Sequence, residues 1–495
     1  MRRFFPDRPV CRIAALAALI VCGSARAQEV LPVQPPAQPQ QAAGTFTPPA
    51  VDAGLRPLPI NLPTALQLAG TDVLDVVAAS ERLRLAGAQL REARTLWLPN
   101  IQFGGDYFRH DGQIQDVQGH VFDDHKGALF AGMAPSATFS VCDAIYSPLA
   151  AKQVVRAREF ELQAAANDSM LAVAEAYMNV QQARGELAGA AEATRRTEEL
   201  ARRTEELVKD LVPRLESVRV NAELAKRQQT ELAARERWRV ASAELLRVLR
   251  LDPAAQVEPV EPPHMRINLL PLDRPVDDYI SFALTNRPEL SAQQALVQAT
   301  LQRLKQERLR PLVPSVLLRG AATNPAGTLS TGTFGGGING DVSNFGFRND
   351  LDLQLIWQLN GLGIGNRAKV EQRRAENQLA LIDWFRVQDR VAADVNQAYG
   401  QAQLAAGRAE LAERGLRLAI ESAELNVNAV KQTKREGEKI VTVVRPAEAV
   451  AAVQALGQAY ADYFTAVADA NRAQFRLYRA LGHPAQLIGN ELPRP

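Results

Sequence analysis

The stretch LDLQLIWQLNGLGIGNRAKVEQRRAEN, residues 351–377, contains the pattern that decides the fold class. In its first part, apolar residues recur at every second position and share one face of an extended chain: Leu351, Leu353, Leu355, Trp357 and Leu359. Ile356 is the one apolar residue on the opposite, polar face. Gly361, Gly363 and Gly365 follow, and then a charged helical pattern begins. The stretch therefore predicts a strand that turns through glycines into a helix.

The predicted strand has about 10 residues, a length that fits a strand tilted across a lipid bilayer. Such a strand would turn its leucines toward lipid and its polar residues toward water. A half-buried strand in a soluble sandwich shows the same alternation, so this feature alone leaves both classes open.

The glycine turn raises the alternative of a nucleotide-binding enzyme. Gly361, Gly363 and Gly365 are spaced G-x-G-x-G, but Asn366 stands where the third glycine of the dinucleotide pattern belongs. The helical pattern after Gly365 also runs on for roughly 65 residues, whereas a dinucleotide fold needs a short crossover helix and a second strand. We therefore interpret the glycines as a hinge, because glycine permits the backbone angles of a sharp bend.

The chain repeats itself. The segment AGAQLREARTLWLPNIQFGGDY, residues 86–107, is echoed by ATLQRLKQERLRPLVPSVLLRGAAT, residues 299–323, and further pairs follow in the same order. Such ordered similarity indicates a duplicated unit that runs helix, strand, loop, strand, long helix, long helix. We predict a first repeat at residues 59–262 and a second at residues 263–485.

The long segments have a helical pattern almost free of proline and glycine. In the second repeat, small and apolar residues step alternately by four and three, as in coiled coils: Val387, Val391, Val395, Ala398, Ala402, Ala405, Ala409, Ala412, Leu416 and Ala419. The first long helix, from about residue 147 to 209, would measure roughly 90–100 Å. Helices of this length do not fit a compact soluble domain.

Two polar, glycine-rich stretches between the predicted strands, residues 109–133 and 324–347, suit exposed loops. The first of them is rich in possible metal ligands: His110, His120, Asp123, Asp124 and His125. Their spacing matches no closed zinc site, so we favour solvated loop residues over a metal site.

The N-terminus predicts export. Arginines precede an apolar run and an A-x-A site, so residues 1–27 are interpreted as a signal peptide, with a lipid anchor on Cys22 as the alternative. Residues 28–58 form a Pro/Gln-rich linker, and residues 486–495 a C-terminal tail. Only Cys142 remains after the signal, which excludes an internal disulfide.

Composition and motifs exclude further classes. The net charge is only +2 from 57 basic and 55 acidic residues, without the basic field that nucleic-acid binding requires. The sequence contains no H-E-x-x-H, no Walker lysine motif, no G-x-S-x-G and no cysteine pair. We therefore expect no catalytic, cofactor-binding or metal-binding residues, and no enzyme.

With these features the chain resembles the TolC-type outer-membrane efflux proteins (outer membrane factors). The resemblance rests on the duplicated unit, the joints LWLPNIQF and LVPSVLL, the paired Ala176-Tyr177 and Ala398-Tyr399, and the segments DLVPRLESVRVNAELA and EGEKIVTVVRPAEAVAAV. It covers nearly all of residues 60–483. No single motif is specific, but the ordered double set is.

The resemblance implies an α+β fold in which a homotrimer forms a 12-stranded outer-membrane β-barrel, continued by a long α-helical barrel in the periplasm. Bends between barrel and helices would lie at six residues: Pro99, Pro148, Pro314, Gly361, Gly363 and Gly365. Trp97 and Trp357 would lie at the membrane interface, where aromatic residues gather. One chain would supply four strands.

The resemblance also implies a function. The chain would be the passive exit duct of a tripartite efflux or type I secretion system, with a periplasmic adaptor and an inner-membrane transporter as partners. A periplasmic coiled-coil adaptor or scaffold without a barrel is the alternative. The sequence does not identify the cargo or the pump.

In this family the turns between long helices close the channel at the periplasmic tip. Glu216 stands where an aspartate is usual, with Arg219 near it, and is either a constriction residue or the partner of Arg219. In the second repeat Val443 takes the acidic position, flanked by Lys439 and Arg445. The acidic ring of some relatives is therefore not expected there.

Overall fold

The computed structural model describes residues 56–482, apart from 70–72, 209–211, 320–328, 330, 340, 431 and 437–438. The predicted signal peptide and C-terminal tail lie outside the described residues, as does the predicted linker up to residue 55. The chain divides into the units Met1–Gly54 and Leu55–Pro495, and every element below belongs to the second.

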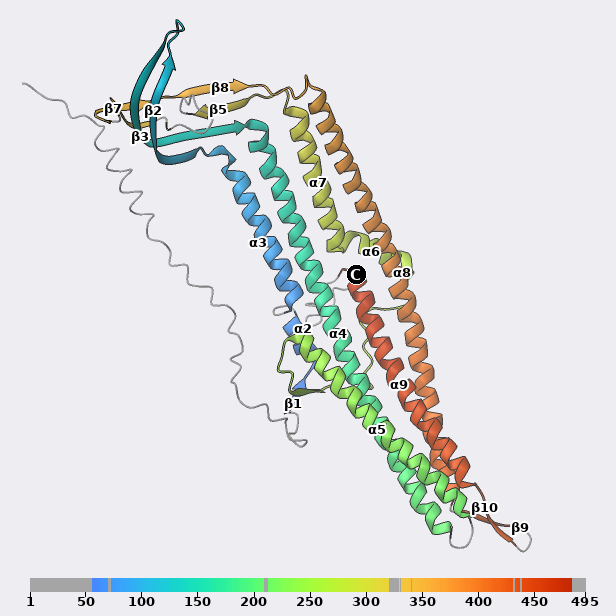
Figure 1. The fold of residues 1–495 in the computed structure, drawn as a ribbon. Helices are drawn as coiled ribbons and strands as arrows, with labels where there is room; N and C mark the ends of the chain where they lie inside the picture. Colours follow the sequence, from blue (N-terminus) through green and yellow to red (C-terminus); the bar gives the residue numbers. More distant parts are fainter. Residues whose placement is uncertain are drawn as a thin grey trace, which may run out of the picture. The chain divides into compact units, whose positions relative to one another are not determined.

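Six strands form one antiparallel sheet at one end of the long helices (Figure 1). They are β2 Asn100–Gln115, β3 Val121–Ser140, β5 Ser315–Arg319, β6 Thr331–Ile338, β7 Asn344–Asn349 and β8 Asp352–Ile356. One edge of β3 pairs with β2, and its other edge pairs first with β6 and then with β5. In turn β7 pairs with β6 and β8 with β5. The sheet therefore has four rows, with β2 at one edge and β7 and β8 at the other.

The prediction of loops at residues 109–133 and 324–347 was wrong for most of these stretches. β2 and β3 continue through the first, leaving only a turn at 116–120, and β6 and most of β7 lie in the second. Glycine there serves strand pairing, since a Cβ on Gly132 would overlap the carbonyl oxygen of Thr331 in β6. The composition resembled a loop because these strands need glycine where they approach closely.

The helices confirm the predicted duplication. The first repeat has α3 Leu74–Arg94, α4 Val141–Leu207 and α5 Arg214–Leu249, and the second has α7 Pro288–Leu309, α8 Ile364–Ala429 and α9 Pro446–Ala480. Matching helices have nearly equal lengths: 21 and 22, 67 and 66, and 36 and 35 residues. Among the described residues, no helix combines the length and apolar character needed to cross a lipid bilayer.

The helices pack as a row whose members change along its length (Figure 1). Near the sheet the order is α3, α4, α7, α8, and farther from it the order is α5, α4, α9, α8. The helices α4 and α8 are continuous through both parts. The predicted coiled-coil positions of α8, from Val391 to Leu416, are mostly buried against these neighbours.

Shorter elements pack on the long helix of each repeat. β1 Arg56–Ile60 pairs in parallel with β4 Ala255–Pro259, and α2 Leu62–Ala69 and α6 Val276–Asn286 pack on α4 and α8. The paired tyrosines have matching roles here. Tyr177 on α4 donates to Ile60 O at 3.1 Å, while Tyr399 on α8 donates to Arg274 O at 2.9 Å. Each anchors the segment that crosses its long helix.

Candidate functional site

One face of the sheet is apolar and exposed. Strand register places Tyr107 opposite Leu129 and Phe103 opposite Met133, and the same face continues across β7 and β8. Its exposed apolar residues are Ile101, Phe103, Tyr107, Leu129, Met133, Phe345, Phe347, Leu353 and Leu355. The predicted alternation is confirmed over β8, where Leu353 is 65% exposed while Gln354 is half-buried. The strand is shorter than predicted, since it has 5 residues and positions 357–359 lie beyond it and are all exposed. A contiguous apolar face of this kind marks contact with lipid or with another protein.

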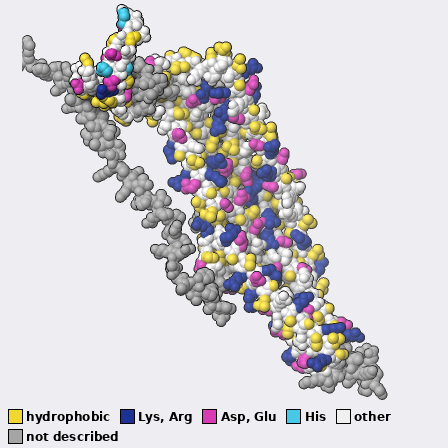
Figure 2. Space-filling view, in the orientation of Figure 1, with side chains coloured by type: hydrophobic (Ala, Val, Ile, Leu, Met, Phe, Trp, Pro, Cys, Tyr) yellow, Lys and Arg dark blue, Asp and Glu magenta, His cyan; other side chains and the backbone are white. Residues whose placement is uncertain are grey.

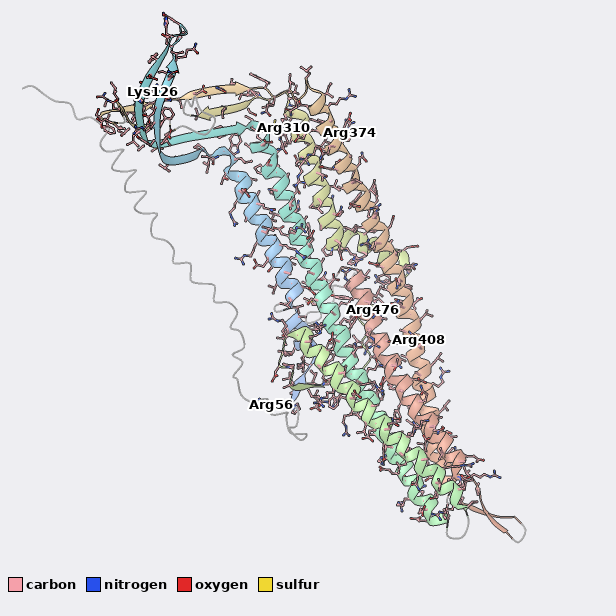
Figure 3. All side chains as sticks on the ribbon, viewed as in Figure 1. Arg56, Lys126, Arg310, Arg374, Arg408 and Arg476 are labelled. Atoms are coloured by element: carbon pink, nitrogen blue, oxygen red, sulfur yellow. The ribbon has the colours of Figure 1, made fainter. Side chains whose placement is uncertain are left out.

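The opposite face is more polar. Asp106 lies opposite Phe130, and His110 lies opposite Lys126, which Figure 3 labels on the sheet. Phe130 is buried and packs on Phe334 with ring centroids 6.3 Å apart. This face also has exposed apolar residues: Phe108, Phe122, Phe334 and Ile338. The two faces of the sheet therefore suit different surroundings, one apolar and one aqueous.

Two tryptophans stand at the border between sheet and helices. Trp97 ends the short 3-10 helix η1 Thr95–Trp97, and Trp357 directly follows β8. Both side chains are about half exposed, at 50% and 56%. Their place at the same border fits the predicted interfacial role, since tryptophan gathers where an apolar phase meets water.

The glycine turn bends β8 into α8. Gly361, Leu362 and Gly363 all have positive φ, at 54°, 55° and 91°. The backbone amides of Gly363 and Gly365 both donate to the carbonyl oxygen of Asn360, at 3.2 and 3.0 Å. These amides are therefore occupied by the chain itself. The turn is a hinge between strand and helix and does not present these donors to a phosphate.

Asn366 is a hinge residue that the sequence interpretation missed. It is buried, and its Oδ1 accepts from the backbone amide of Asn360 at 2.7 Å. Its Nδ2 donates to Gln358 O at 3.4 Å. The signal was present in the sequence, because an asparagine directly after a glycine turn often bonds to nearby backbone.

Two of the three prolines predicted at joints between strands and helices lie at such joints, and the third does not. Pro99 separates η1 from β2, and Pro314 lies just before β5. Pro148 lies inside α4, not at its start, because β3 runs to Ser140 and the helix begins at once. The Ser140 side chain caps α4 by accepting from the Asp143 amide at 3.4 Å.

The start of α4 is also tied to the second repeat. Arg310, just after α7, forms an ion pair with Asp143, and Gln306 donates to the same carboxylate at 2.5 Å (Figure 3). Cys142 beside it is buried, and burial raises the pKa of its thiol. The joints of both repeats thus brace one another.

The tip of the first repeat lies at the N-terminus of α5. Glu216 in its first turn pairs with Arg219 at 3.0 Å, and the Glu216 side chain is only 16% exposed. In the single chain this geometry matches the simpler of the two predicted roles, a helix-end ion pair. A carboxylate in the first turn also suits the helix dipole.

The tip of the second repeat carries a ribbon, β9 Thr433–Glu436 paired with β10 Lys439–Thr442. Val443 follows the ribbon, is exposed and donates its amide to Gln432 O at 2.8 Å. Arg445 is the N-cap of α9 and is exposed. The first repeat has no described strand at the matching place, so the two tips differ.

No cluster of three or more metal-ligating side chains occurs in the part of the chain that the structure describes. Two of the three histidines of the β2–β3 hairpin, His120 and His125, each pair with an aspartate instead. His120 Nδ1 lies 3.1 Å from an Asp116 carboxylate oxygen, and His125 Nδ1 lies 3.2 Å from Asp111. Asp116 also accepts the His120 amide at 2.8 Å, so the turn at 116–120 is held by its own side chains.

The outer side of α8 carries an exposed apolar stripe. Its leucines are one heptad apart and each is about 60–70% exposed: Leu404, Leu411, Leu418 and Leu425. Between them a Cβ on Gly400, Gly407 or Gly415 would meet nothing within 4 Å. We call these seven residues the α8 stripe. In coiled coils, a large side chain of one helix enters a space on the facing helix. The leucines of the α8 stripe could enter such spaces and its glycines could provide them, but no described helix of the same chain covers the stripe.

The other edge of the row also exposes apolar residues, on α3 and α5. They are Leu74, Val77 and Leu85 on α3 and Leu215, Val218, Leu232 and Val240 on α5. On the face that Figure 2 displays, by contrast, acidic and basic side chains are interspersed along the helices. The row therefore has apolar residues exposed at both of its edges.

No model of a known protein family matches the sequence, and no curated protein matches it. Solved structures do match. The outer-membrane channel OprN has a TM-score of 0.67 at 16% identity, over 85% of this chain and 89% of that chain. The outer membrane protein VceC of Vibrio cholerae has a TM-score of 0.64 at 16% identity, over 85% and 96%.

The open state of the MtrE outer membrane channel of Neisseria gonorrhoeae is also similar, with a TM-score of 0.63 at 16% identity over 86% of this chain and 89% of that chain. The chain has the fold of these outer-membrane channels.

Proposed function

We propose that this chain is an outer-membrane exit duct of a tripartite efflux or type I secretion system. It would conduct its cargo passively from an inner-membrane transporter across the periplasm and the outer membrane. The observation that carries the proposal is the sheet, with one exposed apolar face and one polar face, joined by bent hinges to two uninterrupted long helices. This combination suits a wall that passes from lipid into water.

A single chain would be an incomplete duct. The sheet has two open edges, and strand edges with unpaired backbone groups are not tolerated in hydrocarbon. Three copies with four rows each would close a 12-stranded barrel, the assembly that the resemblance implies. Head-to-tail contact of identical chains closes such a ring.

The helical edges support the same assembly. In a ring, the α8 stripe of one copy would meet the outer face of α5 of the next copy, because both lie in the part of the row farther from the sheet. Leucine knobs would then enter spaces on the facing helix, as in coiled coils. This contact would bury the apolar residues that one chain leaves exposed at both edges.

The partners would be a periplasmic adaptor and an inner-membrane transporter, which supplies the energy. The alternative, a periplasmic coiled-coil scaffold, would also use long helices. It leaves the exposed apolar face of the sheet without a function, and we therefore favour the duct. The proposal requires no cofactor, metal or catalytic residue in this chain.

Cell fractionation tests the proposal. An outer-membrane trimer pellets with outer membranes and migrates as a larger species in detergent before boiling than after it. Recovery of the chain as a soluble periplasmic monomer would refute the duct and favour the scaffold.

The tip residue Glu216 is a separate proposal, because three copies would place three such carboxylates around one axis. A ring of like charges concentrates the local potential and selects ions. We expect Glu216→Ala to lower cation preference about twofold in a planar bilayer. Arg214→Ala is the control. If Glu216→Ala leaves the cation preference unchanged, Glu216 is not a constriction residue and its role is the ion pair with Arg219.

A further inference from the structure

The contact between α4 and α9 contains a steric notch. Gly185 and Gly189 lie one turn apart on α4, and each faces an aromatic residue of α9. A Cβ on Gly185 would lie 2.6 Å from Cγ of Phe464, and a Cβ on Gly189 would lie 2.5 Å from Cβ of Tyr460. Only glycine leaves room for these rings at this distance.

One of the two rings that enter the notch, that of Tyr460, also packs toward α8. Tyr460 and Phe464 stack with centroids 6.4 Å apart and ring planes 11° apart. Tyr460 packs against a cluster that includes Leu416 and Ala423 of α8. Tyr460 therefore lies between the two long helices, and the notch determines how closely α9 approaches α4.

Toward the tip, a buried arginine makes a second link. Arg203 on α4 donates to the carbonyl oxygen of Val427 at 2.7 Å and to Oδ1 of Asn428 at 3.3 Å. These acceptors lie in the last turn of α8, where unpaired carbonyls favour a cation. Arg203 also pairs with Glu199 of its own helix. It thus ties the end of α8 to the first repeat.

Toward the sheet, the segment that joins the repeats holds the same two helices. Asn471 of α9 is buried, donates to Met265 O at 2.8 Å and accepts from the Ile267 amide at 2.9 Å. Arg266 donates to Ala409 O of α8 at 2.9 Å. The connecting segment therefore holds the α8–α9 hairpin through hydrogen bonds to backbone groups. Between this segment and the tip, the hairpin is held by the notch and by Arg203.

We propose that the Gly185–Phe464 and Gly189–Tyr460 contacts form a latch that holds the α8–α9 hairpin against α4, with the connecting segment at residues 265–270 as the pivot. The proposal rests on the duct function, because the hairpin would then help to close the periplasmic end. Tyr460 and Phe464 leave the notch when the hairpin swings outward. The closed position is the one in which both rings are seated.

A double-mutant cycle tests the latch through single-channel recordings of the full-length protein in planar bilayers. Gly185→Ala fills the notch, and because overpacking of this kind shifts a two-state equilibrium by roughly tenfold, we expect about a tenfold rise in open probability. Phe464→Ala removes the ring and also raises open probability. In that background Gly185→Ala has no further effect, since its steric conflict with the ring is gone.

Gly87→Ala is the matched control, because a Cβ there would meet only the end of the Arg91 side chain, at 3.9 Å. Gly87 lies on α3, which takes no part in the latch. It should leave open probability unchanged. If Gly185→Ala does not assemble, Phe464→Ala alone decides, by the same measurement.

The outcomes separate the two proposals. If neither the wild type nor any variant forms channels, the duct function fails. If channels form but Gly185→Ala and Phe464→Ala open as rarely as the wild type, the latch is refuted and the duct remains. Independent, multiplicative effects of the two substitutions would also refute the latch.

Discussion

The helices α4 and α8 hold matching places in the two repeats and have 67 and 66 residues, yet α4 buries more than twice as many residues as α8. The difference follows from their neighbours. α4 lies inside the row, between α3 or α5 on one side and α7 or α9 on the other. α8 ends the row and packs mainly on α7 and α9, touching α4 near the tip. Similar sequence patterns thus give one helix that completes a core and one that leaves an apolar stripe exposed.

The largest expected effect comes from a charge in the α8 stripe. Leu418→Asp should abolish assembly, because burying an unpaired carboxylate costs roughly 3–5 kcal/mol at each contact between subunits. The single chain should fold normally, since Leu418 is 59% exposed in it. Size-exclusion chromatography in detergent measures the loss of the larger species.

Arg417→Asp is the control for this change. It places the same side chain one residue away, on an exposed position beside the stripe. It should assemble as the wild type does. If Leu418→Asp assembles equally well, the stripe is not an interface between subunits.

A cavity made in the core beside α4 should lower the stability of the single folded chain. Met178 is fully buried in the largest core, so Met178→Ala should destabilise the folded chain by about 2–5 kcal/mol. Leu404→Ala on α8 is the comparison, and with 72% exposure it should change the stability of the unassembled chain by less than about 0.5 kcal/mol. Chemical denaturation of both variants in the Leu418→Asp background measures this contrast. Equal losses would mean that α8 is as buried as α4.

The sequence predicted much of this contrast but not its cause. Alternation at residues 351–359 correctly indicated a strand, although β8 covers only residues 352–356 of this stretch. The four-and-three steps from Val391 to Leu416 correctly indicated a packed helical face, because local periodicity reports which residues share a face. The same periodicity does not say how many neighbours a helix has. The exposure of Leu404 and Leu425 follows from the order of helices in the row, which depends on long-range contacts.

Other misses have local physical reasons. Residues 109–133 were assigned to a loop because glycine and polar residues are frequent there, while strand pairing depends on backbone groups that composition does not report. Pro148 was placed at a joint because proline usually avoids helix interiors. Asn366 was noticed only as a departure from a glycine pattern, although it is the side chain that holds the turn.

The two helices also start differently, and this predicts unequal effects of substitution at their first turns. Asn366→Ala leaves the partly buried amide of Asn360 without its acceptor and should cost about 1–3 kcal/mol. Ser140→Ala removes a weaker cap of α4 and should cost about 1 kcal/mol. Thermal unfolding of the two variants compares them. A larger loss for Ser140→Ala would contradict the assigned role of Asn366.

The smallest effect is expected at the charged side chains between α7 and α9, where Glu289 lies near Arg287 and Arg479. Glu289 of α7 pairs with Arg479 at 2.7 Å, and burial raises the pKa of Glu289 against the lowering effect of Arg287. Because the folded chain then holds the Glu289 proton more tightly than the unfolded chain, this group adds stability as pH falls through the raised pKa toward 4.5.

Replacing the carboxyl removes that dependence. The unfolding temperature of the wild type relative to Glu289→Gln should rise by about 1–2 °C as the pH is lowered from 7 toward 4.5. A constant difference would show that Glu289 titrates as it does in the unfolded chain, and a difference that falls would show that its pKa is lowered by folding; either result contradicts the raised pKa.

The central claim is that one chain is a third of a duct, with the α8 stripe covered by the next copy. Native mass spectrometry of the complex extracted from outer membranes tests it most directly. Three times the mass of the processed chain for the wild type, and the mass of one chain for Leu418→Asp, is the predicted result. A wild-type complex with the mass of one chain would contradict it.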